Sequence, residues 1–393
     1  MTTTPSALGV VGVTIGVFNP LVLGGIFLET LSEETASIST EKTAYDGYRS
    51  LTFTITGPVE LITSWVENGL GRHIELYNQG GETIFECFVN QVNANVGGVS
   101  VERGPIIDLA NRVRAIYTPI DYSVWPPVVG SETTTILVDD AVSQEFYGII
   151  EKAIGAGRVP DATAEQVRDV FLEENKTPKL STTISISPGS SQVGTVTIDC
   201  VGYSEWLAFY PYQSVVAGYI TADTKLIAVI AGDPNGIFST DVSNIQTSAL
   251  LVGDADFGDK TALDIVREIV TLGNDTTDDR RLFMVLNGRK VYYQTIPTTI
   301  DYTYAIGDVS QAIRDRGGAV VYPWDVMPGK FIEVTDFLPG LLTTTTDPLS
   351  AHNVLFIESV KFTAPWTVDL SGGKTDKLSQ LLAKITYTGG LIQ

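Results

Sequence analysis

The chain has 393 residues, 44% of them hydrophobic and 18% charged, and its 46 acidic and 25 basic residues give a formal net charge of −21. A chain of this length holds about two to four domains with ordinary cores, and its composition excludes a disordered protein. So acidic a surface repels phosphate and argues against specific nucleic-acid binding, although DNA could slide past it without adhering. The acidity is equally explained if it only keeps a β-rich protein soluble.

The first 40 residues are expected to form an apolar N-terminal arm. Residues 8–28 have the hydropathy of a membrane span, but they contain five glycines and the pair Asn19-Pro20, and no Lys or Arg precedes Lys42. Such a segment is a poor transmembrane helix, and it lacks the early basic residues of a secretory signal. We expect no stable membrane insertion, and either two short strands or an extended arm that packs on a neighbouring subunit.

A first β-barrel is predicted from residues 41–125 together with 180–205. The strand-like segments are LTFTIT, VELITSWVENG after the turn Gly57-Pro58, RHIELYN, TIFECFVNQV, TTISIS and GTVTIDCVGY. RHIELYN and TIFECFVNQV flank Gln79-Gly80-Gly81 and therefore predict a hairpin. Strands of this length with frequent turns are typical of a small barrel or sandwich.

A helical insert is predicted between the two parts of this barrel, over residues 126–179. AVSQEFYGIIEKAIGAG follows Asp139-Asp140 and has apolar residues at helical spacing up to Gly155 and Gly157. AEQVRDVFLEEN follows Asp161 and Thr163, with Val167, Val170 and Phe171 on one face. Pro178 would close the insert.

Residues 206–300 are expected to form an α/β domain, and residues 301–393 a second β-barrel. LIAVIA is interpreted as a buried strand, and Asp259 as the cap of a helix over KTALDIVREIVTL that ends at Gly273. RLFMVL and RKVYYQTI flank Asn287-Gly288, which predicts a hairpin with a type I′ turn. The predicted fold class is mainly β with α/β elements (α+β).

Two segments of the chain resemble each other. Residues 85–117 and 356–387 each open with an apolar strand on Phe, turn into a second short strand (Val99–Glu102 and Thr367–Leu370), and close on a Leu-rich basic stretch ending in Tyr. If both segments are real units, the chain carries two related β-units, which is more typical of a ring-forming protein than of an enzyme.

No catalytic, cofactor-binding or metal-binding residue is predicted, and the chain is not expected to be an enzyme. His73 and His352 are far apart with no metal-ligand pattern around them, and we interpret them as surface or barrel-rim residues. Cys87 and Cys200 lie in predicted strands, where they can be two unreactive core thiols or one disulfide.

Four other patterns have simpler explanations than chemistry. Gly373-Lys374-Thr375 looks like the end of a phosphate-binding loop, but Val368 stands where its first glycine is required. Asp254, Asp256 and Asp259 suggest a calcium loop, but Ile265 replaces its last carboxylate, so helix capping is preferred. The adjacent pairs Glu173-Glu174 and Asp139-Asp140 do not form a catalytic dyad. The aromatic cluster Trp206, Phe209, Tyr210 and Tyr212 can stack sugars or form a hydrophobic seam.

The order of these segments over residues 45–393 resembles a known family. The patterns that carry the resemblance are VTIDCVGYSEWLAFYPY, TALDIVREIVTLGN, RLFMVLNGRKVYYQ and, after Pro297, IDYTY. Together they resemble the tail hub, or baseplate hub, proteins of tailed bacteriophages and related contractile injection systems. The resemblance implies two tail-tube-like β-barrels per subunit and a homotrimeric ring that matches a hexameric tail tube. The apolar segment 1–40 is not explained by it.

The implied function is that of a structural virion protein at the tail tip or baseplate, assembled in the host cytoplasm and acting in attachment and genome ejection. Its implied partners are the tail tube protein, distal tail or baseplate proteins, the tape measure, and a spike or central fibre, with DNA passing through the channel unbound. The alternatives are another tail ring component (tube or distal tail protein) and a carbohydrate-binding β-protein. Subunit contacts are expected in 1–30, 84–102 and 354–370, and replacing Val89 or Val360 by Asp should damage assembly or folding.

Overall fold

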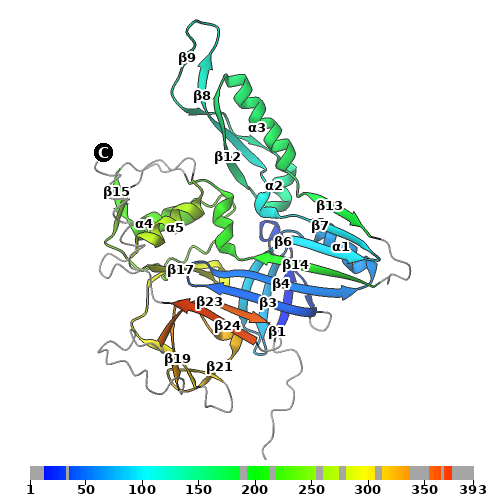
Figure 1. Ribbon diagram of the computed structural model, residues 1–393, viewed down its shortest axis with the longest axis vertical. Coiled ribbons are helices and arrows are strands. Elements are labelled where there is room, and N and C mark those ends of the chain that lie inside the picture. Colours follow the sequence, from blue (N-terminus) through cyan, green and yellow to red (C-terminus); the bar gives the residue numbers. More distant parts are fainter. Residues whose placement is uncertain are drawn as a thin grey trace, which may run out of the picture.

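The computed structural model describes most of the chain, and its elements are drawn in Figure 1. The described residues are 13–31, 35–185, 193–212, 218–253, 260–273, 280–305, 312–335, 354–363 and 367–373. They form a mainly-β fold with both helices and mixed strand pairings, which confirms the predicted α+β class.

The centre of the molecule is a long antiparallel sheet. Its strands are β1 (Val13–Phe18), β2 (Phe27–Leu31), β3 (Thr35–Thr43), β4 (Gly47–Gly57), β5 (His73–Asn78), β6 (Thr83–Val96), β14 (Gly194–Val201), β23 (Val354–Thr363) and β24 (Thr367–Gly373). They pair in the order β2-β1-β5-β6-β14-β4-β3-β23-β24. The order shows that strands from both ends of the sequence share one sheet.

Shorter strands extend this sheet at three places. They are β7 (Val99–Arg103) and β13 (Leu180–Ile184), then β22 (Phe331–Thr335), β19 (Ile300–Ala305), β20 (Ile313–Asp315) and β21 (Val320–Val321), and finally the hairpin of β17 (Arg281–Leu286) and β18 (Lys290–Thr295). The β6–β7 and β23–β24 hairpins are the strand pairs expected from the internal similarity.

The two predicted tail-tube-like barrels are not closed among the residues that the structure describes. The path through the sheet has two open ends, at β2 and β24. The units predicted at 41–125 and 301–393 are joined instead, because β3 pairs with β23 with Lys42 opposite Val360. This contact between distant segments has no local signature in the sequence.

The N-terminal segment belongs to the same sheet. Ile15 and Val17 on β1 are buried, and β1 pairs with β5 and with β2. The expectation of two short strands is therefore confirmed for residues 13–31, whereas an arm lying on a neighbour is wrong for them. In the part of the chain that the structure describes, no helix is long and apolar enough to cross a membrane.

A lobe built from residues 112–175 projects from the main sheet (Figure 1, top). It contains β8 (Arg112–Asp121), β9 (Val128–Val129), β10 (Thr133–Thr134), β11 (Val138–Asp139), α2 (Ala141–Tyr147), β12 (Glu151–Val159) and α3 (Asp161–Asn175). Helix α3 was predicted, but the helix expected over 141–157 ends at Gly148, whose φ is 74°. The rest forms β12, which pairs in parallel with β8, so the insert is not purely helical.

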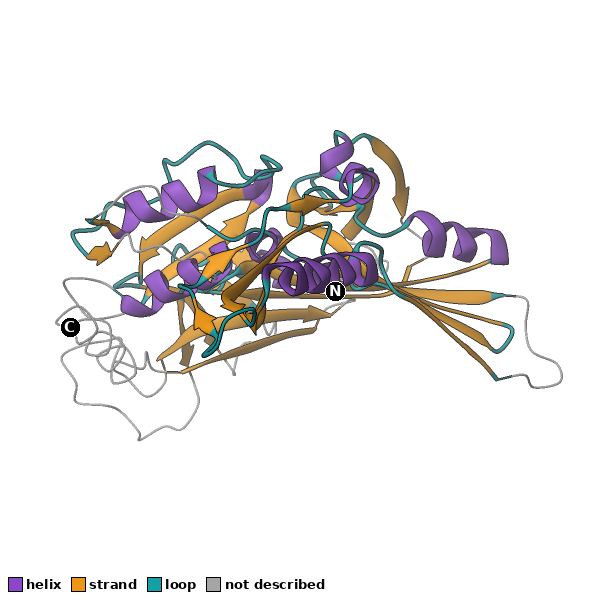
Figure 2. Ribbon diagram, turned by 90° about the horizontal axis from the view of Figure 1, so that it is seen from above, coloured by secondary structure: helices purple, strands orange, loops and turns teal. Residues whose placement is uncertain are grey.

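The remaining helices lie beside the sheet, and Figure 2 shows most helices on one side of the long strands. They are α1 (Val59–Asn68), α4 (Ala222–Ala231), α5 (Ala262–Leu272), and the 3-10 turns η1 (Leu21–Leu23), η2 (Ile106–Asp108), η3 (Tyr203–Phe209), η4 (Asn287–Arg289) and η5 (Pro323–Asp325). A small two-stranded sheet pairs β15 (Tyr219–Thr221) with β16 (Leu251–Gly253). Two predictions of strands were wrong, because VELITSWVEN forms α1 and LIAVIA lies in α4.

The β17–β18 hairpin is confirmed, but its turn is not type I′. Leu286 pairs with Lys290, so three residues form the turn where a type I′ hairpin has two. Gly288 and Arg289 have φ values of 71° and 55°. The predicted helix α5 is also confirmed, but its cap is Thr261, which makes a capping box with Asp264, and not Asp259 as predicted.

Candidate assembly surfaces and a buried polar cluster

The most exposed large side chain of those described lies at the tip of the projecting lobe. Trp125, in the loop between β8 and β9, is 91% exposed. Tyr122, Val124, Val128 and Val129 are also exposed, and we call residues 121–129 the hairpin tip. Large apolar groups gathered in this way typically mark a surface that contacts another molecule.

Apolar side chains continue along the lobe below the hairpin tip. Ile136, Val142 and Phe146 are exposed, as are Val167 and Val170 on α3. Of the predicted apolar face of α3, only Phe171 packs against the lobe's sheet, whereas both valines are exposed. The buried residues of this helix are Ala164, Arg168 and Leu172, one or two turns apart, and this row packs on the lobe's sheet.

The strand pairs predicted as subunit contacts lie mostly inside the molecule. Val89 on β6 is 0% exposed and Val360 on β23 is 2% exposed. Both have strands on either side of them in the sheet, so these positions offer no surface to a partner. In segment 1–30, by contrast, Ile26 in the β1–β2 connection and Phe27 and Leu28 at the start of β2 are exposed.

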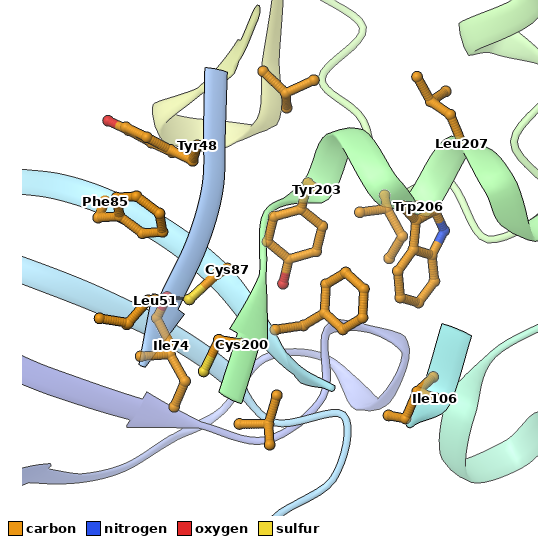
Figure 3. Close-up of a cluster of buried hydrophobic side chains, with 14 of the residues drawn as sticks. Tyr48, Leu51, Ile74, Phe85, Cys87, Ile106, Cys200, Tyr203, Trp206 and Leu207 are labelled. Carbon is orange, nitrogen blue, oxygen red and sulfur yellow. Dashed lines mark hydrogen bonds between the residues drawn. The ribbon is translucent and has the colours of Figure 1, made fainter. Parts of the chain in front are cut away.

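The aromatic cluster of the sequence is a hydrophobic seam and not a sugar platform. Trp206, Phe209 and Tyr210 are buried, and Phe88 on β6 lies edge-on to Trp206 with ring centroids 5.2 Å apart. Figure 3 shows Trp206 and Tyr203 on η3 facing the strands of the main sheet. The cluster attaches η3 to β6, and Tyr212, which is partly buried, has Nζ of Lys225 over its ring at 4.7 Å from the centroid.

Cys87 and Cys200 are free thiols in the core, as the first of the two alternatives predicts. They lie side by side on β6 and β14 (Figure 3) and are buried. Burial, and then the neighbouring Cys200, raise the pKa of Cys87 well above its usual value. A buried thiol without its thiolate form is unreactive.

His73 is buried, so its interpretation as a surface or rim residue is wrong. It is 2% exposed, and its ring lies between three polar side chains. The hydroxyl of Tyr203 is 2.8 Å from Nδ1, and Oε1 of Glu75 is 2.9 Å from Nε2. Oε1 of Glu86 is 3.9 Å from the same Nε2.

The two carboxylates differ in their environment. Burial works to raise the pKa of Glu75, but hydrogen bonds from His73 and Tyr77 outweigh it and keep that pKa below its usual range. Burial raises the pKa of Glu86, which is 4% exposed, although the guanidinium of Arg289 offsets part of the rise. This cluster could not be predicted from the sequence, because only His73 and Glu75 are neighbours on one strand, and the other members come from β6, η3 and η4.

The other candidate residues have structural roles or lie outside the described part. Asp140 caps α2 by accepting the N–H of Ser143, and Asp139 binds Arg112 with an N–O distance of 2.6 Å. Glu173 and Glu174 are exposed on α3. Asp254, Asp256, Asp259, His352, Lys374 and Thr375 lie outside the described residues.

Comparison with protein-family models and with curated proteins gives no match. Among solved structures, a tail protein from Neisseria meningitidis MC58 is similar, with 7% identity, a TM-score of 0.44, and coverage of 94% of this chain and 98% of that one. The 43 kDa tail protein of prophage MuSo2 from Shewanella oneidensis has 9% identity, a TM-score of 0.39, and coverage of 92% and 97%.

Prophage tail protein gp18 from Listeria monocytogenes EGD-e is similar at 9% identity and a TM-score of 0.36, with coverage of 96% of this chain and 99% of that one. All three structures are described as tail proteins.

Proposed function

We propose that this chain is a non-enzymatic structural protein of a phage tail, and that it acts as a homotrimeric hub at the distal end of that tail. In this function it joins the tail tube to a spike or central fibre and lines the channel through which DNA passes. The assignment to a phage tail rests on the resemblance in the sequence. The inference that the chain acts by assembling with other proteins rests on the exposed apolar surface of the lobe.

The observation that carries the proposal is the exposed Trp125 at the hairpin tip. A monomer gains nothing from a tryptophan that is 91% exposed, whereas tryptophan is enriched among the residues that dominate protein interfaces. Exposed apolar groups on the same lobe, such as Ile136 and Val142, extend the surface. Among the described residues β2 and β24 each pair with one strand only, which leaves strand edges that a neighbouring subunit could cover.

The experiment is the mass of the purified protein by light scattering, followed by negative-stain class averages of the same peak. A ring with an open centre and three times the chain mass of 42.3 kDa is expected. Six copies would favour the alternative of a tube or distal-tail ring protein. A monomer that stays monomeric with the tube and distal-tail proteins present would overturn the proposal, and a glycan screen would then test carbohydrate binding.

A further inference from the structure

We propose that His73, Glu75 and Glu86 form a structural binding site for one divalent cation of the Zn²⁺ type. These three residues bring one nitrogen and two carboxylates together, and their ligand atoms all lie within 4.8 Å of one another. The proposal concerns a cation that fastens parts of the fold together, and it is independent of the role in the tail.

The distances suit a small tetrahedral ion. His73 Nε2 lies 2.9 Å from Glu75 Oε1 and 3.9 Å from Glu86 Oε1. Zn²⁺ with bonds of about 2.0–2.2 Å requires ligand atoms separated by about 3.3 Å in a tetrahedron. Small side-chain rotations reach this value, and water would take the fourth position.

Each of the three side chains is held by its other polar atom. The His73 Nδ1 atom contacts the Tyr203 hydroxyl at 2.8 Å. Oε2 of Glu75 accepts the hydroxyl of Tyr77 at 2.5 Å, and Oε2 of Glu86 accepts the backbone N–H of Gly288 at 2.6 Å. Partners of this kind orient metal ligands in known sites, because they fix the geometry of the ring and of the carboxylates.

The charge of the cluster favours a cation. Two carboxylates face one another around His73, and Arg289 is the one cationic side chain that pairs with either of them among the described residues, at 3.4 Å from Oε1 of Glu86. Glu86 and His73 are buried, so the remaining negative charge is poorly solvated. Glu75 is half-buried and provides the side from which a cation can enter.

The donor set selects the class of ion. Imidazole nitrogen with two carboxylates suits Zn²⁺ and its transition-metal neighbours, whereas Ca²⁺ and Mg²⁺ prefer oxygen ligands alone. The bound ion would connect β5 to β6 and, through Glu86, to the turn of the β17–β18 hairpin. It would therefore connect the β5–β6 hairpin to the β17–β18 hairpin.

The test uses the full-length protein without a histidine tag, freed of metal with EDTA and titrated with ZnCl₂ in a calorimeter. One Zn²⁺ per chain is expected, together with a rise in Tm that EDTA reverses. Glu75→Gln should weaken Zn²⁺ binding at least tenfold, because it removes a ligand while keeping the shape of the side chain. Co²⁺ in place of Zn²⁺ should give visible absorption that the same variant loses.

Two controls separate this site from accidental binding. Glu82→Gln changes an exposed carboxylate on the same β5–β6 hairpin, and His352→Gln removes the other histidine of the chain. Both should bind Zn²⁺ like the wild type. If the wild type takes up no Zn²⁺, or if Glu75→Gln binds it equally well and shows the same rise in Tm, the cluster is a hydrogen-bonded network only and the proposal is wrong.

Discussion

Glu86 and Gly288 are 202 residues apart in the sequence, yet Oε2 of Glu86 accepts the backbone N–H of Gly288 at 2.6 Å. The same oxygen accepts the N–H of Arg289 at 3.2 Å. These two residues form the turn with positive φ between β17 and β18. The turn is therefore held from outside by a carboxylate on β6, which explains why it departs from the two-residue form that Asn-Gly favours.

We expect Glu86→Gln to lower the free energy of unfolding by about 1–3 kcal/mol, because the buried, charged acceptor of two backbone N–H groups is replaced by a neutral one. Urea unfolding in the presence of EDTA measures this effect without a contribution from bound metal. Glu82→Gln, on the exposed end of the same hairpin, should leave the midpoint unchanged. Equal midpoints for Glu86→Gln and wild type would show that the contact does not stabilise the fold.

We expect Lys42 to make the stability of the folded protein depend on pH in the alkaline range. It is buried on β3, and its Nζ donates to the carbonyl of Trp324 at 2.6 Å. Burial lowers its pKa to about 8, although Asp325 works in the opposite direction. Since the folded state releases this proton more easily than the unfolded state, stability is gained as pH rises from about 8 to 10.5 and lost as pH falls through about 8.

The gain should amount to about 3 kcal/mol, since one pKa unit corresponds to about 1.36 kcal/mol. Lys42→Met removes the titrating group, so the difference in unfolding free energy between wild type and variant should change by this amount between pH 7 and pH 11. Chemical denaturation at several pH values measures it. A difference that stays constant over this range would contradict the lowered pKa.

The two cysteines should be unreactive in the folded protein. Cys87 and Cys200 are buried, and the pKa of Cys87 is raised, so little thiolate is available to a reagent. A thiol reagent such as DTNB should label neither residue in native buffer. It should label both when the protein is fully unfolded, in about 6 M guanidinium without reductant. No labelling after unfolding would instead indicate a disulfide.

Replacing Val89 by Asp should prevent folding, and not assembly alone. Its side chain is buried between strands, and an unpaired carboxylate there costs several kcal/mol. The expected result is insoluble protein or loss of the far-UV spectrum of a β-protein, and Val360→Asp should behave in the same way. Val99→Asp, at an exposed position on β7, is the matched control and should fold. A soluble, folded Val89→Asp monomer would place this residue at an interface.

Elements with a strong local pattern could be predicted from the sequence. The β5–β6 and β17–β18 hairpins follow from alternating apolar residues around glycine-containing turns, and α5 follows from a helical apolar face. LIAVIA was misread because a short apolar run fits a buried strand or a buried helix equally well. In the longer segment Ala222–Ala231 the buried residues include Ala222, Leu226 and Val229, which is helical spacing.

Strand β12 and the buried polar cluster depend on contacts between residues that are distant in the sequence. Residues 151–159 form a strand because β8 lies beside them, although their apolar spacing fits a helix. His73 and Tyr203 are 130 residues apart, so no spacing rule could place them together. For the candidate surface a signal was present: Trp125 is followed by two prolines in YSVWPPVVG, and a tryptophan in such a turn is poorly placed for a core.

Trp125 provides the last prediction, because it separates assembly from folding. Its side chain makes little contact with the rest of the chain, so Trp125→Ser should change the free energy of unfolding of the monomer by no more than about 0.5 kcal/mol. If the hairpin tip enters a pocket of a partner, the same change should cost about 2 kcal/mol or more of association free energy. Sedimentation velocity over a range of concentrations measures the shift towards monomer, and circular dichroism reports the fold.

The matched control for this variant is Tyr219→Ser, which removes an exposed aromatic ring on β15, away from the lobe. It should assemble like the wild type, since an isolated exposed ring is common on protein surfaces and needs no partner. Assembly that survives Trp125→Ser but fails with Tyr219→Ser would move the interface from the lobe to the segment around β15. Loss of assembly with Trp125→Ser, but not with Tyr219→Ser, would place the hairpin tip at the contact between subunits.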